Sequence, residues 1–142
     1  MRKEYVVIRM ADHADLKYLT VVQPLPGERV VEKIKNEEVF LLVVGGTPVG
    51  QLWLEFLWSL VPYIALIKIE EQHRKKGYSR KLLGFCEDFL RGKGHEVLYS
   101  SSQMDEPAPQ AWHRHMGFEE CGAINGINQG GVGEVFFRKK LV

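Results

Sequence analysis

The spacing of hydrophobic residues predicts a chain of short strands and amphipathic helices. Apolar, often β-branched runs that are typical of strands lie at residues 5–10, 39–44, 49–58, 63–69, 97–101 and 134–140. Apolar residues recur at helical spacing at 28–36 and 78–90, with charged residues mostly on the other side. The order β-α-α-β-β-β-α-β-α-β predicts an α/β fold, a mixed and mostly antiparallel sheet with flanking helices.

Capping and turn residues mark the ends of several of these elements. Asp12 is placed to cap a helix that runs to about residue 19, with Asp15 at the third helical position. Gly45 and Gly46 separate two apolar runs as a hairpin turn does. A segment led by prolines at residues 107–116 predicts a last short helix, which Gly117 closes.

Length and charge limit the classes of protein that fit. The chain has 142 residues, 45% of them hydrophobic, which predicts a single folded domain over residues 1–142 with a core of its own. Its formal net charge of +1 argues against a protein that binds nucleic acid through a broad basic face. A cationic site on this chain is therefore expected to be local.

Cysteine and histidine usage predicts neither a disulfide framework nor a metal site. Cys86 and Cys121 form no metal-type spacing, and we expect both to be small buried residues in a reducing compartment.

Residues 1–5 begin no long apolar leader, and the apolar stretch at 52–69 is interrupted by charged residues and a proline. We expect a cytoplasmic protein with no membrane partner.

One strand-to-helix junction concentrates positive charge. Six basic side chains lie between His73 and Lys81, directly after an apolar run and at the start of a helical pattern. The first N–H groups of a helix lack internal acceptors and bind phosphate readily. Gly77 can adopt positive φ and let a ligand approach the backbone. Together these features suit a pyrophosphate group.

The junction taken alone is compatible with two alternative roles. It contains neither G-x-x-x-x-G-K-[ST] nor G-x-G-x-x-G, so the two familiar phosphate loops do not fit. A solvated charged loop before a helix is the plainest alternative. A basic patch for nucleic acid is a weaker one, because no broad basic face or aromatic RNA-binding motif accompanies it.

Three segments in order resemble the GCN5-related N-acetyltransferase (GNAT) superfamily. Residues 74–79, RKKGYS, resemble its R/Q-x-x-G-x-G/A signature, and residues 112–118, WHRHMGF, resemble its late aromatic-x-x-x-x-Gly-Phe segment. Residues 8–16 are similar to the family's first strand and helix. The resemblance spans nearly the whole chain and implies one GNAT domain, with Ser79 in place of the usual small Gly or Ala.

The resemblance also implies acetyl-CoA as co-substrate, without a metal. In this family the cofactor lies in a splay between two parallel strands. Its pyrophosphate would sit on the loop formed by Arg74, Lys75, Lys76, Gly77, Tyr78 and Ser79. Its pantetheine would pair with the backbone of Ile67, Lys68 and Ile69 on the preceding strand. Side chains at these strand positions can be apolar, because backbone groups make the contacts.

The residues implied for catalysis depart from the family pattern. A lysine-like amine with a pKa near 10.4 needs about 4–5 kcal/mol to be neutral at pH 7, so a base helps. Relatives often place an acidic residue where this chain has Leu66, and Glu55 is the nearest acidic alternative. Glu55 facing solvent or pairing with a lysine is an equal expectation.

His113 stands where many relatives have the tyrosine that protonates the departing thiolate. The alternative is a histidine that only fills the helix surface beside Trp112. Trp53 and Trp58 are candidates to line the acceptor pocket, with core packing as the alternative.

The resulting hypothesis is direct acetyl transfer from acetyl-CoA to a primary amine. The acceptor would be a small molecule or a peptide, and a homodimer is a further expectation from the family. The competing hypothesis is a catalytically silent GNAT-like domain that binds CoA and acts as a sensor or regulator.

Overall fold

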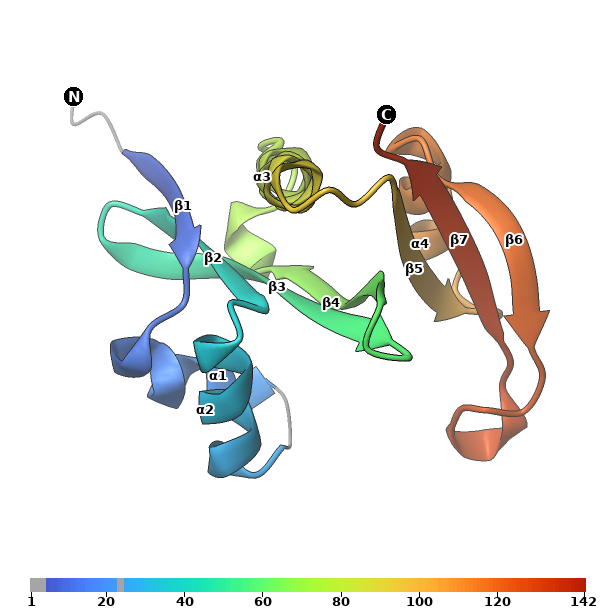
Figure 1. Cartoon of the computed structure of the whole chain (residues 1–142), viewed down its shortest axis with the longest axis horizontal. Coiled ribbons are helices and arrows are strands. Elements are labelled where there is room, and N and C mark those ends of the chain that lie inside the picture. The colour runs from blue at the N-terminus through green and yellow to red at the C-terminus, as the bar shows by residue number, and fades with distance from the viewer. Residues whose placement is uncertain (1–4, 23–24) are drawn as a thin grey trace. The chain divides into compact units, whose positions relative to one another are not determined.

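A computed structural model describes residues 5–22 and 25–142 (Figure 1). Residues 1–4, part of the segment in which no leader was recognised, and residues 23–24 lie outside the described residues. The strands are β1 (Val6–Met10), β2 (Val39–Val44), β3 (Thr47–Leu57), β4 (Val61–Ile69), β5 (Val97–Gln103), β6 (Glu119–Ile124) and β7 (Glu134–Lys140). The helices are α1 (Leu16–Val22), α2 (Gly27–Lys35), α3 (Tyr78–Gly92) and α4 (Pro107–His115), with short 3-10 turns η1 (His13–Asp15), η2 (Glu71–His73) and η3 (Gln129–Gly131).

Among the described residues the strands pair in the order β1-β2-β3-β4-β5-β7-β6. The register pairs β4 with β5 in parallel at Tyr63 and Tyr99, and β1 with β2, β2 with β3, β5 with β7 and β6 with β7 antiparallel. The predicted mixed sheet with flanking helices is confirmed. The sequence analysis did not predict strand β6. All its residues are exposed and Gly122 lies at an irregularity in its pairing, so the sequence has no alternation of apolar and polar residues there.

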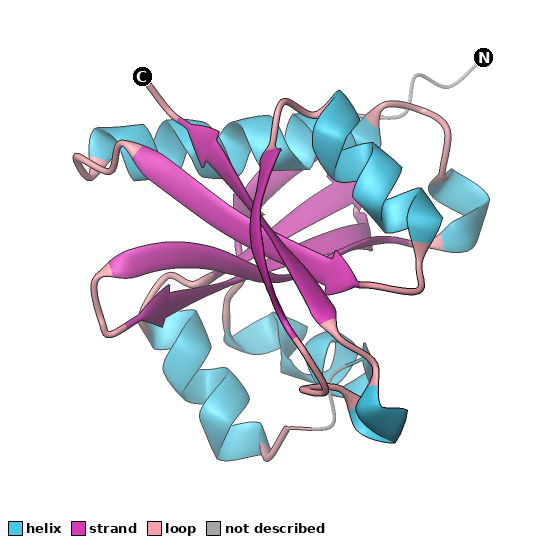
Figure 2. Cartoon of the chain, turned by 90° about the vertical axis from the view of Figure 1, so that its right-hand side faces the viewer, coloured by secondary structure: helices cyan, strands magenta, loops and turns pink. Residues whose placement is uncertain are grey.

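The chain divides into two compact units, each built from two stretches of sequence. One unit holds Met1–Leu54 and Leu66–Cys86, and the other holds Glu55–Ala65 and Glu87–Val142. Figure 2 shows the helices of both units in cyan and their strands in magenta. The division interrupts β3, β4 and α3, so a single domain over residues 1–142 stays a prediction.

The first unit has its core between strands β1–β3 and helices α1 and α2. Every residue of β2 is buried, as expected of a strand covered on both faces. The core cluster on the side of the two helices consists of Ala11, Leu19, Val30, Val39, Leu41, Val43 and Trp53. Leu66 from the end of β4 packs against this cluster, so its apolar side chain has a structural role.

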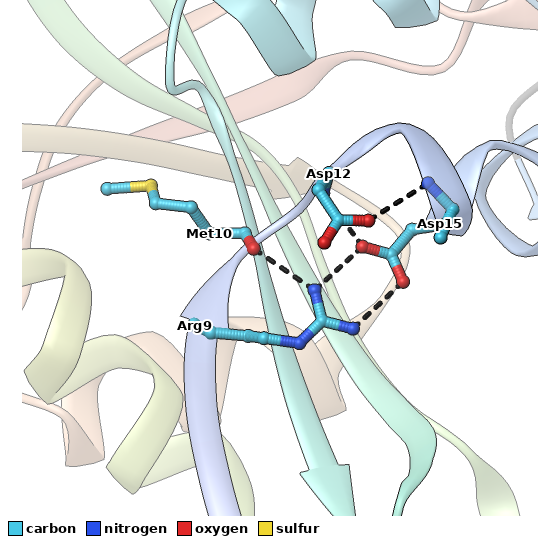
Figure 3. A network of polar contacts seen from close by, with 5 residues as sticks. Arg9, Met10, Asp12 and Asp15 are labelled. Carbon is cyan, nitrogen blue, oxygen red and sulfur yellow. Dashed lines mark hydrogen bonds and ion pairs between the residues drawn. The ribbon is translucent and has the colours of Figure 1, made fainter.

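A bidentate ion pair fixes the start of the first helical segment (Figure 3). The Arg9 guanidinium on β1 donates to both carboxylate oxygens of Asp15, with distances of 2.7 and 2.9 Å. The Asp15 carboxylate also accepts from the Asp12 amide, and the Asp12 carboxylate accepts from the Ala14 amide. This is the capping box that the sequence predicts. The bond from Arg9 lowers the pKa of Asp15 despite its burial.

The second unit is built on β5, β7 and β6, with α4 packed against them (Figure 1). Leu98, Ser100 and Ser102 alternate as buried residues along β5, and Tyr99 and Ser101 are only partly buried. On β7 the buried residues are Val135 and Phe137. One face of this sheet therefore belongs to the core beneath α4, and the other carries the partly exposed side chains.

Candidate functional site

The loop between β4 and α3 has an unusual backbone at the predicted phosphate site. Lys75 and Gly77 both have positive φ, of 64° and 78°. A non-glycine residue in this region costs on the order of 1 kcal/mol, and Lys75 shares it with Glu37, Trp58 and Ser59 at other turns of the chain. The Gly77 carbonyl accepts the first helical bond from the Lys81 amide at 3.2 Å. Gly77 is thus the residue from which α3 departs.

Arg74 ties this loop to the end of β4. Its Nε donates to the Ile69 carbonyl at 2.9 Å, and its own amide donates to the Glu71 carbonyl at 3.2 Å. The Glu70 amide in turn donates to the Val49 carbonyl on β3 at 2.8 Å. These bonds hold the loop in one conformation while its cationic groups stay near the surface.

The junction presents positive charge and backbone donors together. Arg74, Lys75 and Lys76 are exposed, and Gly77 has no other protein atom within 4 Å of where a Cβ would be. Helix α3 is 15 residues long, so its N-terminus carries the partial positive charge of a full helix dipole. Such an arrangement binds phosphate groups. The structure brings residues 74–79 together at one helix N-terminus, as predicted.

The strand before the loop is partly accessible. Ile67 and Lys68 are half-buried and Ile69 is buried. Sequence reasoning missed the part that Gly50 plays on neighbouring β3. A Cβ at Gly50 would lie 2.6 Å from Cδ1 of Ile69 and 3.4 Å from the Lys68 carbonyl oxygen, so only glycine allows this close approach without displacing the Ile69 side chain.

Buried polar side chains support the end of β4 in the first unit. The Tyr18 hydroxyl donates to Oε1 of Glu70 at 3.1 Å, and burial, aided by Glu70, raises the pKa of Tyr18 to about 12. Oε1 of Gln51 accepts from Nε1 of Trp53 at 2.7 Å. Trp53 is 1% exposed and belongs to the core cluster. The position of Trp53 therefore agrees with core packing, the alternative to lining the acceptor pocket. Trp53 could influence an acceptor only indirectly, by supporting the residues that cover it.

His113 lies in the core of the second unit. It is 3% exposed, and its ring stacks on Phe137 with 4.6 Å between centroids. Nδ1 lies 2.7 Å from the Pro109 carbonyl oxygen and Nε2 lies 2.7 Å from Oγ of Ser100. A carbonyl oxygen only accepts, so Nδ1 carries the proton and Nε2 accepts from the Ser100 hydroxyl.

Burial also lowers the pKa of His113, which favours the neutral ring. In this arrangement the neutral ring has no proton left over for a thiolate. A catalytic His113 would have to exchange one of its two partners, so the acid role stays a prediction, and the contacts support the packing alternative.

Glu55 and Trp58, two further side chains that the sequence proposed for the site, lie near the turn between β3 and β4. Glu55 is exposed on β3, and its charge contributes, after burial, to the raised pKa of Tyr63 on β4. Trp58 was expected at the end of a strand, either lining the acceptor pocket or packed in the core. Instead it is 84% exposed and has a φ of 53° in the turn that follows β3. The strand expectation was wrong because the Trp58-Ser59 pair forms the turn itself.

A polar network in the second unit was not anticipated from the sequence. The Ser101 hydroxyl on β5 donates to Oε2 of Glu134 on β7 at 2.6 Å. The Tyr63 hydroxyl lies 2.5 Å from Oγ of Ser101, and Nδ2 of Asn128 donates to Oε1 of Glu134 at 2.8 Å. Tyr63 and Glu134 are 71 positions apart in the sequence, and the other two residues lie between them. No local motif could therefore have predicted the network.

The described residues contain no group of three or more His, Cys, Asp or Glu side chains that could hold a metal ion. Cys86 is buried as predicted, whereas Cys121 is exposed on β6. In the described part of the chain, no helix is both long and apolar enough to cross a membrane.

The chain is similar to known acetyltransferases in sequence pattern and in fold. A sequence model described as the Acetyltransferase (GNAT) family matches residues 8–118. No curated protein matches the chain by sequence. Among solved structures, an N-acetyltransferase from Staphylococcus aureus Mu50 is 16% identical with a TM-score of 0.83, over 97% of this chain and 99% of that one.

Two further structures share the fold at low identity. The yncA protein of Salmonella typhimurium, solved with its cofactor acetyl-CoA, is 17% identical with a TM-score of 0.82, over 97% of this chain and 95% of that one. A ribosomal-protein-alanine N-acetyltransferase from Brucella melitensis is 22% identical with a TM-score of 0.80, over 94% and 99% of the two chains.

Proposed function

The chain belongs to the acetyltransferase (GNAT) family, and we propose that it is an acetyl-CoA-dependent N-acetyltransferase acting on a primary amine by direct transfer. The observation that carries the proposal is the β4–α3 junction. There, exposed cations, two positive-φ residues and a helix N-terminus coincide at Arg74 to Ser79. The alternative, a solvated charged loop, accounts for the exposed cations alone, whereas a phosphate ligand would also use the helix N-terminus and the open backbone at Gly77.

The residues present fit the diphosphate of CoA. The α3 N-terminus and Gly77 would hold the phosphates through backbone N–H groups, with Arg74, Lys75 and Lys76 supplying charge. The backbone of Ile67, Lys68 and Ile69 would pair with the amides of the pantetheine arm. When bound, acetyl-CoA supplies the thioester that acylates the amine.

The transfer itself needs a neutral amine and a stable leaving group. The amine nitrogen attacks the thioester carbon, the C–N bond forms, the C–S bond breaks, and CoA leaves as a thiolate with a pKa near 8.5. Glu55 remains a proposed base for the proton of the ammonium group. His113 remains the proposed acid for the thiolate, and this role requires it to exchange one of its two hydrogen-bond partners.

The acceptor is proposed to be a small-molecule or peptide amine. A peptide that begins with alanine is a reasoned first probe, because the Brucella melitensis protein of the same fold is a ribosomal-protein-alanine N-acetyltransferase. One domain over residues 1–142, a cytoplasmic location, a homodimer and the absence of nucleic-acid and membrane partners are further parts of the proposal.

A second function is favoured by a specific observation. Both ring nitrogens of His113 are engaged, and Leu66 occupies the strand position where relatives often have an acid. A CoA-binding domain that senses or regulates, without turnover, would need neither catalytic group.

Acetyl-CoA binding and CoA release decide between these functions. The purified chain should bind acetyl-CoA in calorimetry and release free thiol with at least one member of a panel of peptide, polyamine and aminoglycoside amines. Binding without thiol release would favour the sensor, and the absence of binding would contradict both.

A further inference from the structure

Glu134 is a carboxylate on the partly exposed sheet face of the second unit, and hydrogen bonds hold both of its oxygens. Its Oε2 accepts from Ser101 on the adjacent strand β5, and its Oε1 accepts from Asn128 in the β6–β7 loop. The loop is itself braced, because the Asn128 amide donates to the Val132 carbonyl at 3.0 Å. Two donors from different segments therefore fix the direction of the carboxylate.

The hydrogen-bonded chain continues from Glu134 to Tyr63. Because Ser101 uses its proton on Glu134, the Tyr63 hydroxyl must donate to Oγ of Ser101. Burial, with the charges of Glu134 and Glu55, raises the pKa of Tyr63, so the phenol stays protonated at neutral pH. Tyr63 is also held by its ring, which lies 6.0 Å from that of Phe136 on β7.

This network and His113 are on opposite faces of the sheet. His113 contacts Ser100 and stacks on Phe137, whereas Ser101 is the next residue along β5 and pairs with Phe136. Successive side chains of a strand point to opposite faces. The Glu134 carboxylate therefore stands away from the α4 core, on the partly exposed face of the sheet.

The surroundings of Glu134 combine an apolar surface with the anion. Ile124 pairs directly with Glu134 and is 46% exposed, and such cross-strand pairs share a face. Met104, which follows β5, is 44% exposed and its amide donates to the carbonyl of Gly133, beside Glu134. An alkyl ammonium ion matches this combination of an anionic group and neighbouring apolar side chains.

We propose that Glu134 binds the ammonium group of the acceptor and, in place of Glu55, takes its proton, with Ser101 and Tyr63 as positioning residues. This inference rests on the proposed N-acetyltransferase function. The ammonium group transfers one proton to a Glu134 oxygen, which leaves a neutral amine and a carboxylic acid. The amine nitrogen then forms the C–N bond as the C–S bond of acetyl-CoA breaks. The sulfur leaves with the electron pair and takes up the second proton, which the nitrogen loses as the amide forms, and the proton on Glu134 is returned to solvent.

Among the described residues, the charge of Glu134 acts on two titratable groups of other elements, Tyr63 on β4 and His113 on α4, and Arg138 is a cation four residues along the same strand. The Glu134 charge raises the pKa of both, although burial outweighs it at His113 and lowers that pKa. Both groups are neutral in this arrangement near pH 7.

A binding experiment tests the proposal without turnover. The full chain is titrated with n-butylammonium chloride at pH 6 while the backbone NMR signals of residues 101, 128 and 134 are followed. We expect saturable shifts in the parent and at least tenfold weaker binding in Glu134→Gln. Glu120→Gln, which removes an exposed carboxylate from neighbouring β6, serves as the matched control and should bind as the parent does.

Two outcomes of this titration would overturn the proposal. One is equal affinity in Glu134→Gln. The other is the absence of saturable shifts in the parent, or the same shifts with uncharged butan-1-ol. Neither outcome depends on whether acetyl-CoA binds, so a failure here is distinguishable from a failure of the proposed function in the calorimetric measurement.

The pH dependence of turnover separates proton transfer from a structural role. With an amine that the parent acetylates, Glu134→Gln should reduce kcat/KM at least tenfold at pH 7. The ratio to the parent should approach one near pH 10, where the amine loses its proton unaided. Ser101→Ala should show part of this loss, and Ser101→Thr, which keeps the hydroxyl, should restore it. A loss that is constant across pH would exclude Glu134 as the proton acceptor.

Discussion

Gly77→Val is the sharpest test of the phosphate site, because the structure offers a matched control at the other end of the same helix. Gly77 has a φ of 78° and Gly94 a φ of 89°, and neither has an atom within 4 Å of where a Cβ would be. An L side chain in this backbone region costs about 1–2 kcal/mol. Both valine variants should therefore lose similar stability through backbone strain alone.

The size of the expected effects follows from the length of the chain. Unfolding entropy of about 2.1 cal/mol/K per residue gives about 0.3 kcal/mol/K for 142 residues. Each valine variant should then melt about 3–7 °C below the parent. Acetyl-CoA at 100 times its Kd should stabilise the parent by about 2.7 kcal/mol, which raises Tm by about 9 °C.

Differential scanning fluorimetry with and without acetyl-CoA measures both effects, and calorimetry supplies the Kd. Gly94→Val should keep the ligand-induced rise of the parent. Gly77→Val should lose it, because the added branched side chain occupies the space from which phosphates approach the backbone. An equal rise in the two variants would refute the assignment of residues 74–79 to the phosphates, and a parent that does not respond to millimolar acetyl-CoA would refute the cofactor itself.

Three other predictions test the ion pair and the two residues proposed for catalysis. Asp15→Asn should lower the free energy of unfolding by about 1–2 kcal/mol at pH 7, a modest value because the Arg9 side chain is 37% exposed. The lowered pKa of Asp15 makes this contribution present at neutral pH and lost as pH falls through that pKa, so urea unfolding that shows the same difference in acid would contradict it. Glu55→Gln tests the alternative base: a loss of turnover chiefly at neutral pH would assign the proton to Glu55 instead of Glu134, and thiol-release rates that match the parent from pH 6 to 9 would remove Glu55 as the base. His113→Ala should cost about 2–4 kcal/mol of stability in urea unfolding, because it removes a ring stacked on Phe137. Its acid role predicts in addition at least a tenfold fall in kcat at constant acetyl-CoA Kd, with partial rescue by His113→Tyr, and an intact kcat would end that proposal.

Several features of the fold are local properties and could be predicted from the sequence. The capping box at Asp12 and Asp15 depends on residues three apart, and strand β2 at residues 39–44 is a continuous apolar run between turn residues. The cationic loop at residues 74–79 is equally local, because its cations, Gly77 and the following helix are contiguous in the chain. Strand β6 could not be predicted in this way, because backbone hydrogen bonds pair it with β7 and its six exposed side chains show no apolar pattern.

The sequence by itself determined the strand and helix order apart from β6, and the cationic loop at the start of α3, because both depend on residues close together in the chain. Only the tertiary structure decided the environment of the remaining candidates. It buried His113 between Ser100 and Phe137 and left Trp58 at the surface. It also joined Tyr63, Ser101 and Glu134, which lie on three strands. Burial and cross-strand contact arise from strand pairing over long separations, and no local spacing encodes which carboxylate such pairing brings to a given hydroxyl.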